Sequence, residues 1–149
     1  MMEDIPEETL EKMRDAARDA RGNAFVHEGR TSMGAAVLTD DGEIFQGCNT
    51  QSVISGMGSC AERNAMDNAL SHGEYCFRAI LILSGKEMPP NPCGMCLQYM
   101  AELSDVSGHD IQLIMVGADG TTERDQARNR LTETYSLEDS GKDMSSYEC

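Results

Sequence analysis

The chain has 149 residues, 40% of them hydrophobic, and its 12 Lys and Arg against 26 Asp and Glu give a formal net charge of −14. This length is typical of one domain, which can bury a core without added cross-links. We therefore predict a single domain over residues 1–149. The acidic balance argues against a nucleic-acid groove, because neutralising phosphates requires clustered Lys and Arg. A small-molecule partner is expected instead.

The sequence predicts neither a membrane span nor a secretory signal. Its longest apolar run, AILIL at residues 79–83, is far shorter than the ~20 residues that cross a bilayer. The acidic start MMEDIPEE lacks the basic and apolar regions of a signal peptide. We expect a cytoplasmic protein. In a reducing compartment, its six cysteines favour metal binding over disulfides as a first interpretation.

The first predicted element is a helix over residues 6–24, opened by Pro6 and acidic residues. Its apolar residues form one stripe: Leu10, Met13, Ala17, Ala20 and Ala24. After a loop, two short strands within residues 34–49 flank the sequence DDG, which is a strong hairpin signal. A Gly- and Ser-rich connection over residues 51–59 follows. Its last residue, Ser59, is expected to cap a helix that begins near Cys60 and ends at Gly73.

The second half of the chain alternates buried strands with helices. A strand is predicted over residues 78–84, a proline-rich loop over 86–92 and a helix from Cys93 onward. A second buried strand over residues 111–117 precedes a turn and a short helix over 123–131. This order predicts a three-layer α/β/α sandwich with a mixed sheet of about five strands. The polar tail from about residue 138 is expected to be flexible.

Three cysteines stand at predicted helix starts. Cys93 and Cys96 open one helix, and Cys60 opens the other. If both helices begin at the same edge of the sheet, their partial positive charges favour the thiolates that a metal needs. Three soft sulfur ligands select zinc, and a set of three leaves a fourth tetrahedral position for water, as in catalytic sites.

The residues after Cys60 supply the other groups that such chemistry needs. Glu62 is close enough to lie beside the metal without binding it and to take a proton from the water. Arg63 is expected to donate to the sulfurs and offset the negative charge of three thiolates. A structural zinc site in a binding module is the non-enzymatic alternative, with Cys48 or Cys76 as a fourth ligand.

Residues 30–105 resemble the cytidine deaminase family. The shared motifs are MGAAVLTDDGEIFQGCN, CAERNA and PCGMCLQ, in the family's order and approximate spacing. The resemblance implies that Cys60, Cys93 and Cys96 hold Zn²⁺ and that Glu62 carries protons from water to the ring nitrogen and the leaving amine. It also implies base contacts from the N–H of Ala61 and a carbonyl near Pro92. Three cysteine ligands and a short chain further resemble the homotetrameric branch.

The segments that would bind the substrate depart from the family pattern. Asn49 matches a ribose-binding asparagine, but Gln51 replaces the family's ribose-binding glutamate, and charge-assisted hydrogen bonds are the stronger kind. Thr31 lies near the place of an aromatic that packs on the pyrimidine, and Leu97 replaces a common arginine. We expect cytidine or deoxycytidine as first substrate. Alternatives are a cytosine-containing antibiotic, as for blasticidin S deaminase, or a modified cytosine nucleoside.

Overall fold

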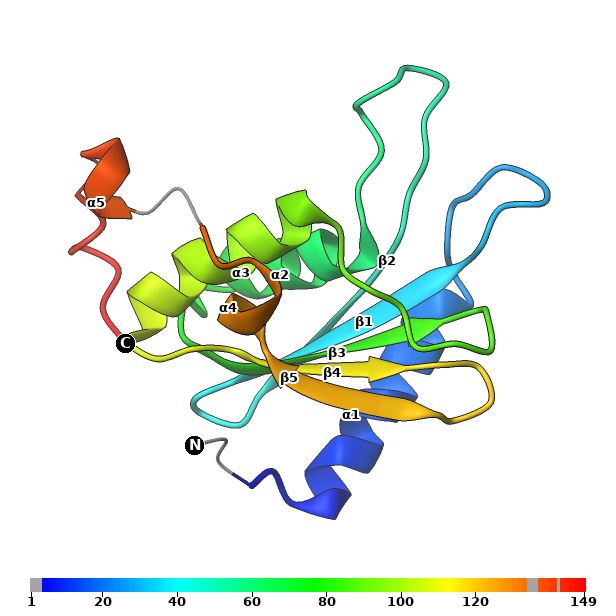
Figure 1. Cartoon of the computed structure of the whole chain (residues 1–149), viewed down its shortest axis with the longest axis horizontal. Helices are drawn as coiled ribbons and strands as arrows, with labels where there is room; N and C mark the ends of the chain where they lie inside the picture. The colour runs from blue at the N-terminus through cyan, green and yellow to red at the C-terminus, as the bar shows by residue number, and fades with distance from the viewer. Residues whose placement is uncertain (1–3, 134–136, 142) are drawn as a thin grey trace.

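The computed structural model describes residues 4–133, 137–141 and 143–149. Figure 1 shows a twisted sheet with one long helix on one face and two on the other, so the predicted three-layer α/β/α sandwich is confirmed. The strands lie in the order β2-β1-β3-β4-β5, and only β3 and β4 run parallel. Their bounds are Met33–Thr39 (β1), Ile44–Cys48 (β2), Phe77–Ser84 (β3), Gln112–Val116 (β4) and Thr122–Gln126 (β5).

The helices bury opposite faces of this sheet. Helix α1 lies alone on one face, and α2 and α3 cover the other (Figure 1). Two further helices have only four residues each. The helix bounds are Glu7–Arg21 (α1), Ala61–Ser71 (α2), Gly94–Ser107 (α3), Ala127–Arg130 (α4) and Leu137–Ser140 (α5).

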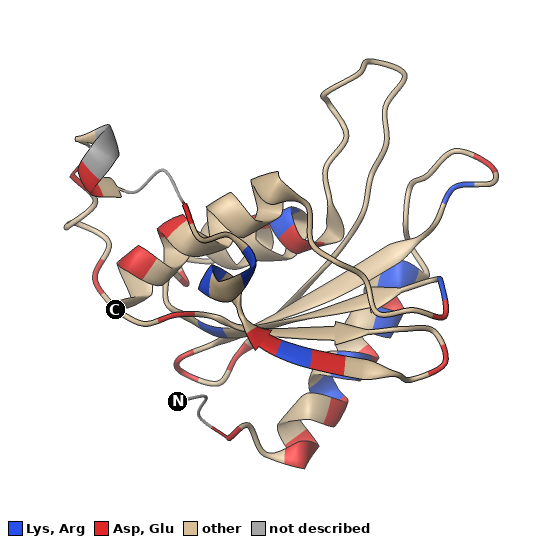
Figure 2. Ribbon diagram, in the orientation of Figure 1, with Lys and Arg blue, Asp and Glu red and all other residues tan. Residues whose placement is uncertain are grey.

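The central strands alternate between two hydrophobic cores. In β3, Ala79 and Leu81 face α1, whereas Ile80 and Ile82 face α2 and α3. Because successive side chains of a strand point to opposite faces, a strand covered on both sides is apolar throughout. Figure 2 shows charged residues on the helices, on β5 and in the loops, and none on β1 or β4. Burial on both faces therefore explains why β1 and β4 carry no charged residues.

Helix α2 is fastened to the edge strand β2. Gly47 lets the helix approach the strand, because a Cβ there would lie 2.3 Å from the backbone nitrogen of Ala65. The side chains of Asn64 and Asn68 donate to the β2 carbonyls of Cys48 (2.7 Å) and Gln46 (3.0 Å). The start of α2 is thereby fixed relative to the sheet.

The predicted helix over residues 123–131 is wrong over its first half. Residues Thr122–Gln126 form β5, antiparallel to β4, and only Ala127–Arg130 are helical. The strand reverses from β4 through a turn at Gly120, whose φ of 89° favours glycine. Glu, Arg and Gln favour helices in isolation, but pairing with the edge of β4 overrides that preference.

The expected Ser59 cap is also wrong. Cys60 is the N-cap residue of α2, and no side chain caps it. Ser59 instead pairs through its backbone with Thr50, with both N–H to O distances at 2.9 Å. This pairing closes the base of the loop over residues 50–59. The predicted helix end at Gly73 is confirmed, because α2 ends at Ser71 and Gly73 adopts a positive φ of 82°.

The cysteines serve two purposes. Cys76, directly before β3, forms a disulfide with Cys149, and their Cα atoms are 5.5 Å apart. The first interpretation of the cysteines as metal ligands therefore holds for some of them and not for this pair. The flexibility expected of the tail stays a prediction. None of the described helices is long and apolar enough to cross a membrane.

Candidate active site

The site lies at the edge of the sheet where β1 begins and β2 and β3 end. Met33 pairs with Ser84 at the end of β3, and Gly34 pairs with Cys48 at the end of β2. The loops that leave β2 and β3 at this edge lead into α2 and α3. Both helices therefore begin here with their positive ends, which favours thiolates and other negative groups.

The three cysteines at these helix starts form one cluster. Their sulfur atoms all lie within 4.8 Å of one another. Cys60 and Cys93 Sγ are 3.7 Å apart, and Cys93 and Cys96 Sγ are 3.4 Å apart. Zinc–sulfur bonds of about 2.3 Å in a tetrahedron place neighbouring sulfurs about 3.8 Å apart. The cluster therefore fits a zinc ion with three thiolate ligands.

The remaining cysteines stand outside this cluster. Cys48 ends β2 as a free thiol, and Cys76 is joined to Cys149. Among the described residues, only the three clustered cysteines form a group able to hold a metal. A three-sulfur site leaves one tetrahedral position for a non-protein ligand.

The surroundings of the sulfurs favour the thiolate form of Cys60. In the metal-free chain, a hydrogen bond from Cys96 lowers the pKa of Cys60 to about 5, and the nearby charge of Arg63 adds to this effect. The same interaction and burial raise the pKa of Cys96. The Nη2 atom of Arg63 also donates to the carbonyl of Gly58 at 3.5 Å. Arg63 also interacts with the sulfurs of Cys60 and Cys96, and its role in offsetting their charge stays a prediction.

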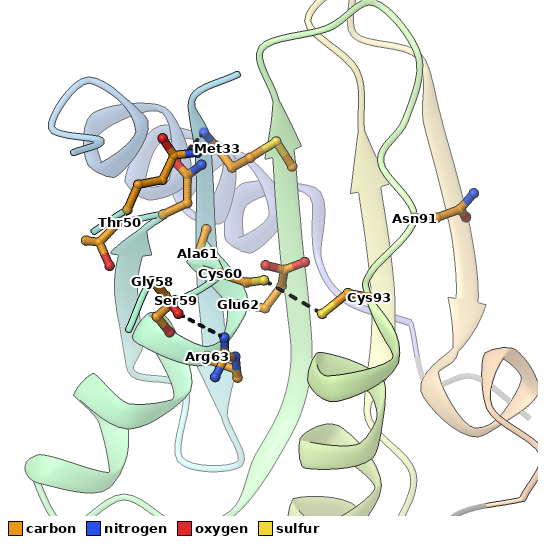
Figure 3. Close-up of a pocket in the computed structure, with 12 residues that line it drawn as sticks. Met33, Thr50, Gly58, Ser59, Cys60, Ala61, Glu62, Arg63, Asn91 and Cys93 are labelled. Carbon is orange, nitrogen blue, oxygen red and sulfur yellow. Dashed lines mark hydrogen bonds between the residues drawn. The ribbon is translucent and has the colours of Figure 1, made fainter. Parts of the chain in front are cut away.

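Glu62 is buried next to the cluster. Its side chain is only 5% exposed, and Figure 3 shows the carboxylate close to the sulfur of Cys60. Burial, with a smaller contribution from the negative charge of Cys60, raises the pKa of Glu62 to about 7. A carboxyl group with a pKa near neutrality is suited to accept and return a proton.

A cavity of about 390 Å³ opens above these groups. Its volume suits a small molecule. Its wall includes all three substrate-contact residues expected from the sequence, Asn49, Gln51 and Ala61, together with Cys60, Glu62, Arg63 and Cys93. Five further residues line it without having been singled out beforehand: Met33, Thr50, Gly58, Ser59 and Asn91.

Two of the polar residues in this wall are already engaged by the chain. Asn49 accepts a hydrogen bond from the N–H of Met33 (2.8 Å) and donates to the carbonyl of Thr31 (3.0 Å). The Oε1 atom of Gln51 accepts from the N–H of His27 at 2.7 Å. Both side chains therefore hold the loop over residues 27–33 as well as lining the cavity. None of these three hydrogen bonds leaves a pattern in the local sequence.

The two other departures from the family pattern lie outside the cavity wall. Thr31 contributes its backbone carbonyl to Asn49, and the side chain of Leu97 is buried in the core beside α2. Among the lining residues that sequence alone did not single out, Asn91 is the one whose place near the site could have been predicted from its position in the sequence. It stands just before Pro92 and Cys93, in a loop that must deliver a ligand.

Comparisons with known proteins agree with this geometry. The family model of the cytidine and deoxycytidylate deaminase zinc-binding region matches residues 7–107. A cytidine deaminase of Sporosarcina psychrophila is 33% identical over 130 residues, which are 87% of this chain and 93% of the relative. A probable cytidine deaminase of Dictyostelium discoideum is 34% identical over 134 residues, 89% of this chain and 88% of the relative.

The fold of a solved relative is also similar. The crystal structure of a cytidine deaminase from Burkholderia pseudomallei matches with a TM-score of 0.76 and 31% identity, over 83% of this chain and 97% of the relative. Sequence, fold and sulfur cluster thus agree. The chain belongs to the cytidine and deoxycytidylate deaminase family of zinc-dependent hydrolases, which act on carbon–nitrogen bonds.

Proposed function

We propose that this protein deaminates a cytosine nucleoside, cytidine or deoxycytidine first, to the uracil form with release of ammonia. The observation that carries the proposal is the cluster of Cys60, Cys93 and Cys96 with buried Glu62 beside it at the wall of a small cavity. The names of the relatives, cytidine deaminases, support the same substrate class.

The three cysteines would hold the zinc ion, and Arg63 would offset part of their negative charge. When bound, zinc lowers the pKa of a water ligand toward neutrality and acts as a Lewis acid. Cys60, Glu62 and Cys93 line the cavity, so a substrate bound in the cavity would bring its amino-bearing carbon close to them. Burial of Glu62 and Cys96 keeps bulk water from the other side.

Glu62 would carry both protons of the reaction. It takes one proton from the attacking water and gives it to the ring nitrogen next to the amino-bearing carbon. It then transfers the second proton of the water to the amino group, which leaves as ammonia, while the oxygen stays on the ring as a carbonyl. The N–H of Ala61 is free to bind the base, because the first N–H groups of a helix have no partner within it.

Asn49 and Gln51 would face the sugar. Gln51 is an amide that already accepts a backbone hydrogen bond, so it offers a weaker contact to a ribose hydroxyl than a carboxylate does. This observation favours a second candidate, the deamination of a cytosine-containing antibiotic in the manner of blasticidin S deaminase. A modified cytosine nucleoside satisfies the same arrangement.

A substrate panel tests the proposal. Zinc-loaded protein is assayed for ammonia release from cytidine, deoxycytidine, modified cytosine nucleosides and blasticidin S. A kcat/KM for one nucleoside that exceeds the value for the antibiotic by orders of magnitude supports the first candidate, and the reverse supports the second. Release from none of these compounds overturns both. X-ray absorption that shows four sulfurs and no lighter ligand would instead indicate structural zinc.

The oligomeric state and location stay predictions. We propose a homotetramer, associated through helices that flank the site, and a cytoplasmic location. The loop beside the cavity exposes apolar side chains, with Val53 95% and Ile54 59% exposed, and such groups are available for association. Light scattering after size-exclusion chromatography measures the mass, and a monomer at micromolar concentration contradicts the tetramer.

A further inference from the structure

The segment that delivers Cys93 to the site is held by few hydrogen bonds. Residues 87–92 include Pro89, Pro90 and Pro92, which have no N–H to donate. Backbone hydrogen bonds flank the segment, from Ala118 N–H to the Lys86 carbonyl (2.7 Å) and from Leu97 N–H to the Cys93 carbonyl (3.0 Å). Between them, the backbone of residues 87–92 makes no hydrogen bond to the described residues.

One side chain anchors this segment. The Oδ1 atom of Asn91 accepts a hydrogen bond from Nη1 of Arg130 at 3.0 Å. Within the described chain, this is the only hydrogen bond made by residues 87–92. In Figure 3 the side chain of Asn91 points away from the sulfurs, although the residue belongs to the cavity wall. The hydrogen bond to Arg130 therefore holds the segment on the side that faces away from the sulfurs.

Arg130 is itself held firmly from strand β5. Its Nε atom donates to Oδ2 of Asp125 at 2.7 Å, and its Nη2 atom lies 3.5 Å from a carboxylate oxygen of Glu123. Asp125 accepts two more bonds at Oδ1, from the Asn129 side chain and the Gln126 N–H, both at 2.8 Å. The side chains of Arg130 and Asp125 are 29% and 24% exposed, so the pair is partly shielded from water.

We propose that Arg130 is a positioning residue for the zinc site: through Asn91 it fixes the segment 87–92 and so the place of the Cys93 sulfur. This inference rests on the proposed role of Cys93 as a zinc ligand. The guanidinium suits the task because its planar fork reaches acceptors on both β5 and the segment at once. Cys93 is the most exposed of the three cysteines. Its position therefore depends less on burial than on the segment that leads to it.

Arg130 lies beyond the part of the chain that matches the zinc-binding region of the family, residues 7–107. It comes from the element whose structure local sequence failed to predict. The edge strand β5 and the short helix α4 thereby acquire a role in the site. They hold Arg130, which contacts Asn91, a residue 39 positions earlier in the sequence.

Zinc affinity is the measurement that tests this role. Arg130→Met and Asn91→Ala are each compared with the unchanged protein by competition against a chromophoric zinc chelator. Each is expected to lose about 10-fold in zinc affinity, the scale seen when a group that orients a metal ligand is removed. Hydrogen exchange should rise in peptides covering residues 87–96. The double variant should lose about 10-fold and not 100-fold, because both changes remove the same contact.

Arg128→Met is the matched control. Arg128 lies in the same short helix, but its guanidinium contacts Asp105 and Asp110 and not the segment. Its zinc affinity should stay within about twofold of the unchanged protein. The proposal is overturned if Arg130→Met binds zinc as Arg128→Met does, or if the effects of Arg130→Met and Asn91→Ala multiply. Asn91→Ala alters only a loop side chain, so it keeps the test valid if Arg130→Met fails to fold.

These outcomes are distinct from a failure of the proposed function. A protein that binds zinc but deaminates no cytosine compound still gives the affinity ratios that decide the role of Arg130. Conversely, active protein with unchanged affinity in Arg130→Met keeps the function and removes the positioning role.

Discussion

Two regions meet at the cavity, and they are built differently. The first is the chemical half, made of Cys60, Glu62, Cys93 and Cys96, in which Cys96 is 0% and Glu62 5% exposed. The second is the recognition rim, made of Asn49, Gln51 and the loop over residues 52–58, in which Val53 is 95% exposed. Helix starts packed on the sheet hold the chemical half, whereas loops hold the rim. The positions of Glu62 and Cys96 are thus fixed more firmly than those of the residues on the rim.

The rim also uses its polar side chains for its own structure. Asn49 and Gln51 make hydrogen bonds to the backbone of residues 27–33. In the chemical half, by contrast, the carboxylate of Glu62 interacts with its own backbone N–H and holds no loop among the described residues. A change at Glu62 should therefore alter turnover alone, while a change in the rim should alter both stability and substrate binding.

The largest effect is expected for Glu62→Gln. Removing the proton carrier should lower kcat by about 1000-fold, the middle of the range for general acid–base groups, with zinc still bound. Turnover by ammonia release and zinc content by atomic absorption measure the two quantities. Glu74→Gln, a change at a half-buried residue after α2 and outside the cavity wall, serves as the control. Turnover retained in Glu62→Gln would remove Glu62 from the mechanism.

Cys96→Ala should weaken zinc binding by more than roughly 100-fold, because a direct ligand matters more than a group that orients one. Activity should fall with the metal content. Cys48→Ala removes a free cysteine outside the cluster and should leave zinc affinity unchanged. Chelator competition compares the two variants. Equal affinities would mean that the cluster is not the zinc site.

Asn49→Ala tests the rim as a structural element. It removes two hydrogen bonds to the loop backbone, so a loss of about 1–3 kcal/mol in the free energy of unfolding is expected. Urea denaturation measures this loss. KM should rise as well, because the cavity wall loosens. A variant with unchanged stability and only a raised KM would show that Asn49 serves the substrate alone.

Gln51→Glu should have the smallest effect and the opposite sign. A carboxylate can still accept from the His27 N–H, and it offers a charge-assisted bond to a sugar hydroxyl. KM for cytidine should fall by about 10-fold, the equivalent of about 1.4 kcal/mol, with kcat nearly unchanged. Free cytosine, which lacks the sugar, is the matched control substrate. An equal change for cytosine and cytidine would exclude a contact between residue 51 and the sugar.

Much of the fold follows from patterns local in the chain. The apolar stripe of α1, the hairpin turn at Gly42 and the apolar run AILIL of β3 are each recognised by periodicity or turn chemistry, because burial imposes those patterns on consecutive residues. The strand β5 was missed, because its residues are charged and lie at an exposed edge. Only the neighbouring strand β4 decides that Thr122–Gln126 are extended.

The same division applies to the site. By itself, the sequence predicted the cluster of three cysteines with Glu62 beside it, because a metal site needs particular residue types at defined spacing near helix starts. Tertiary structure alone decided the long-range contacts: the disulfide of Cys76 with Cys149, the bonds of Asn49 to the loop before β1, and the reach of Arg130 to Asn91. Contacts between distant residues leave no local pattern, since they depend on which strands become neighbours in the folded sheet.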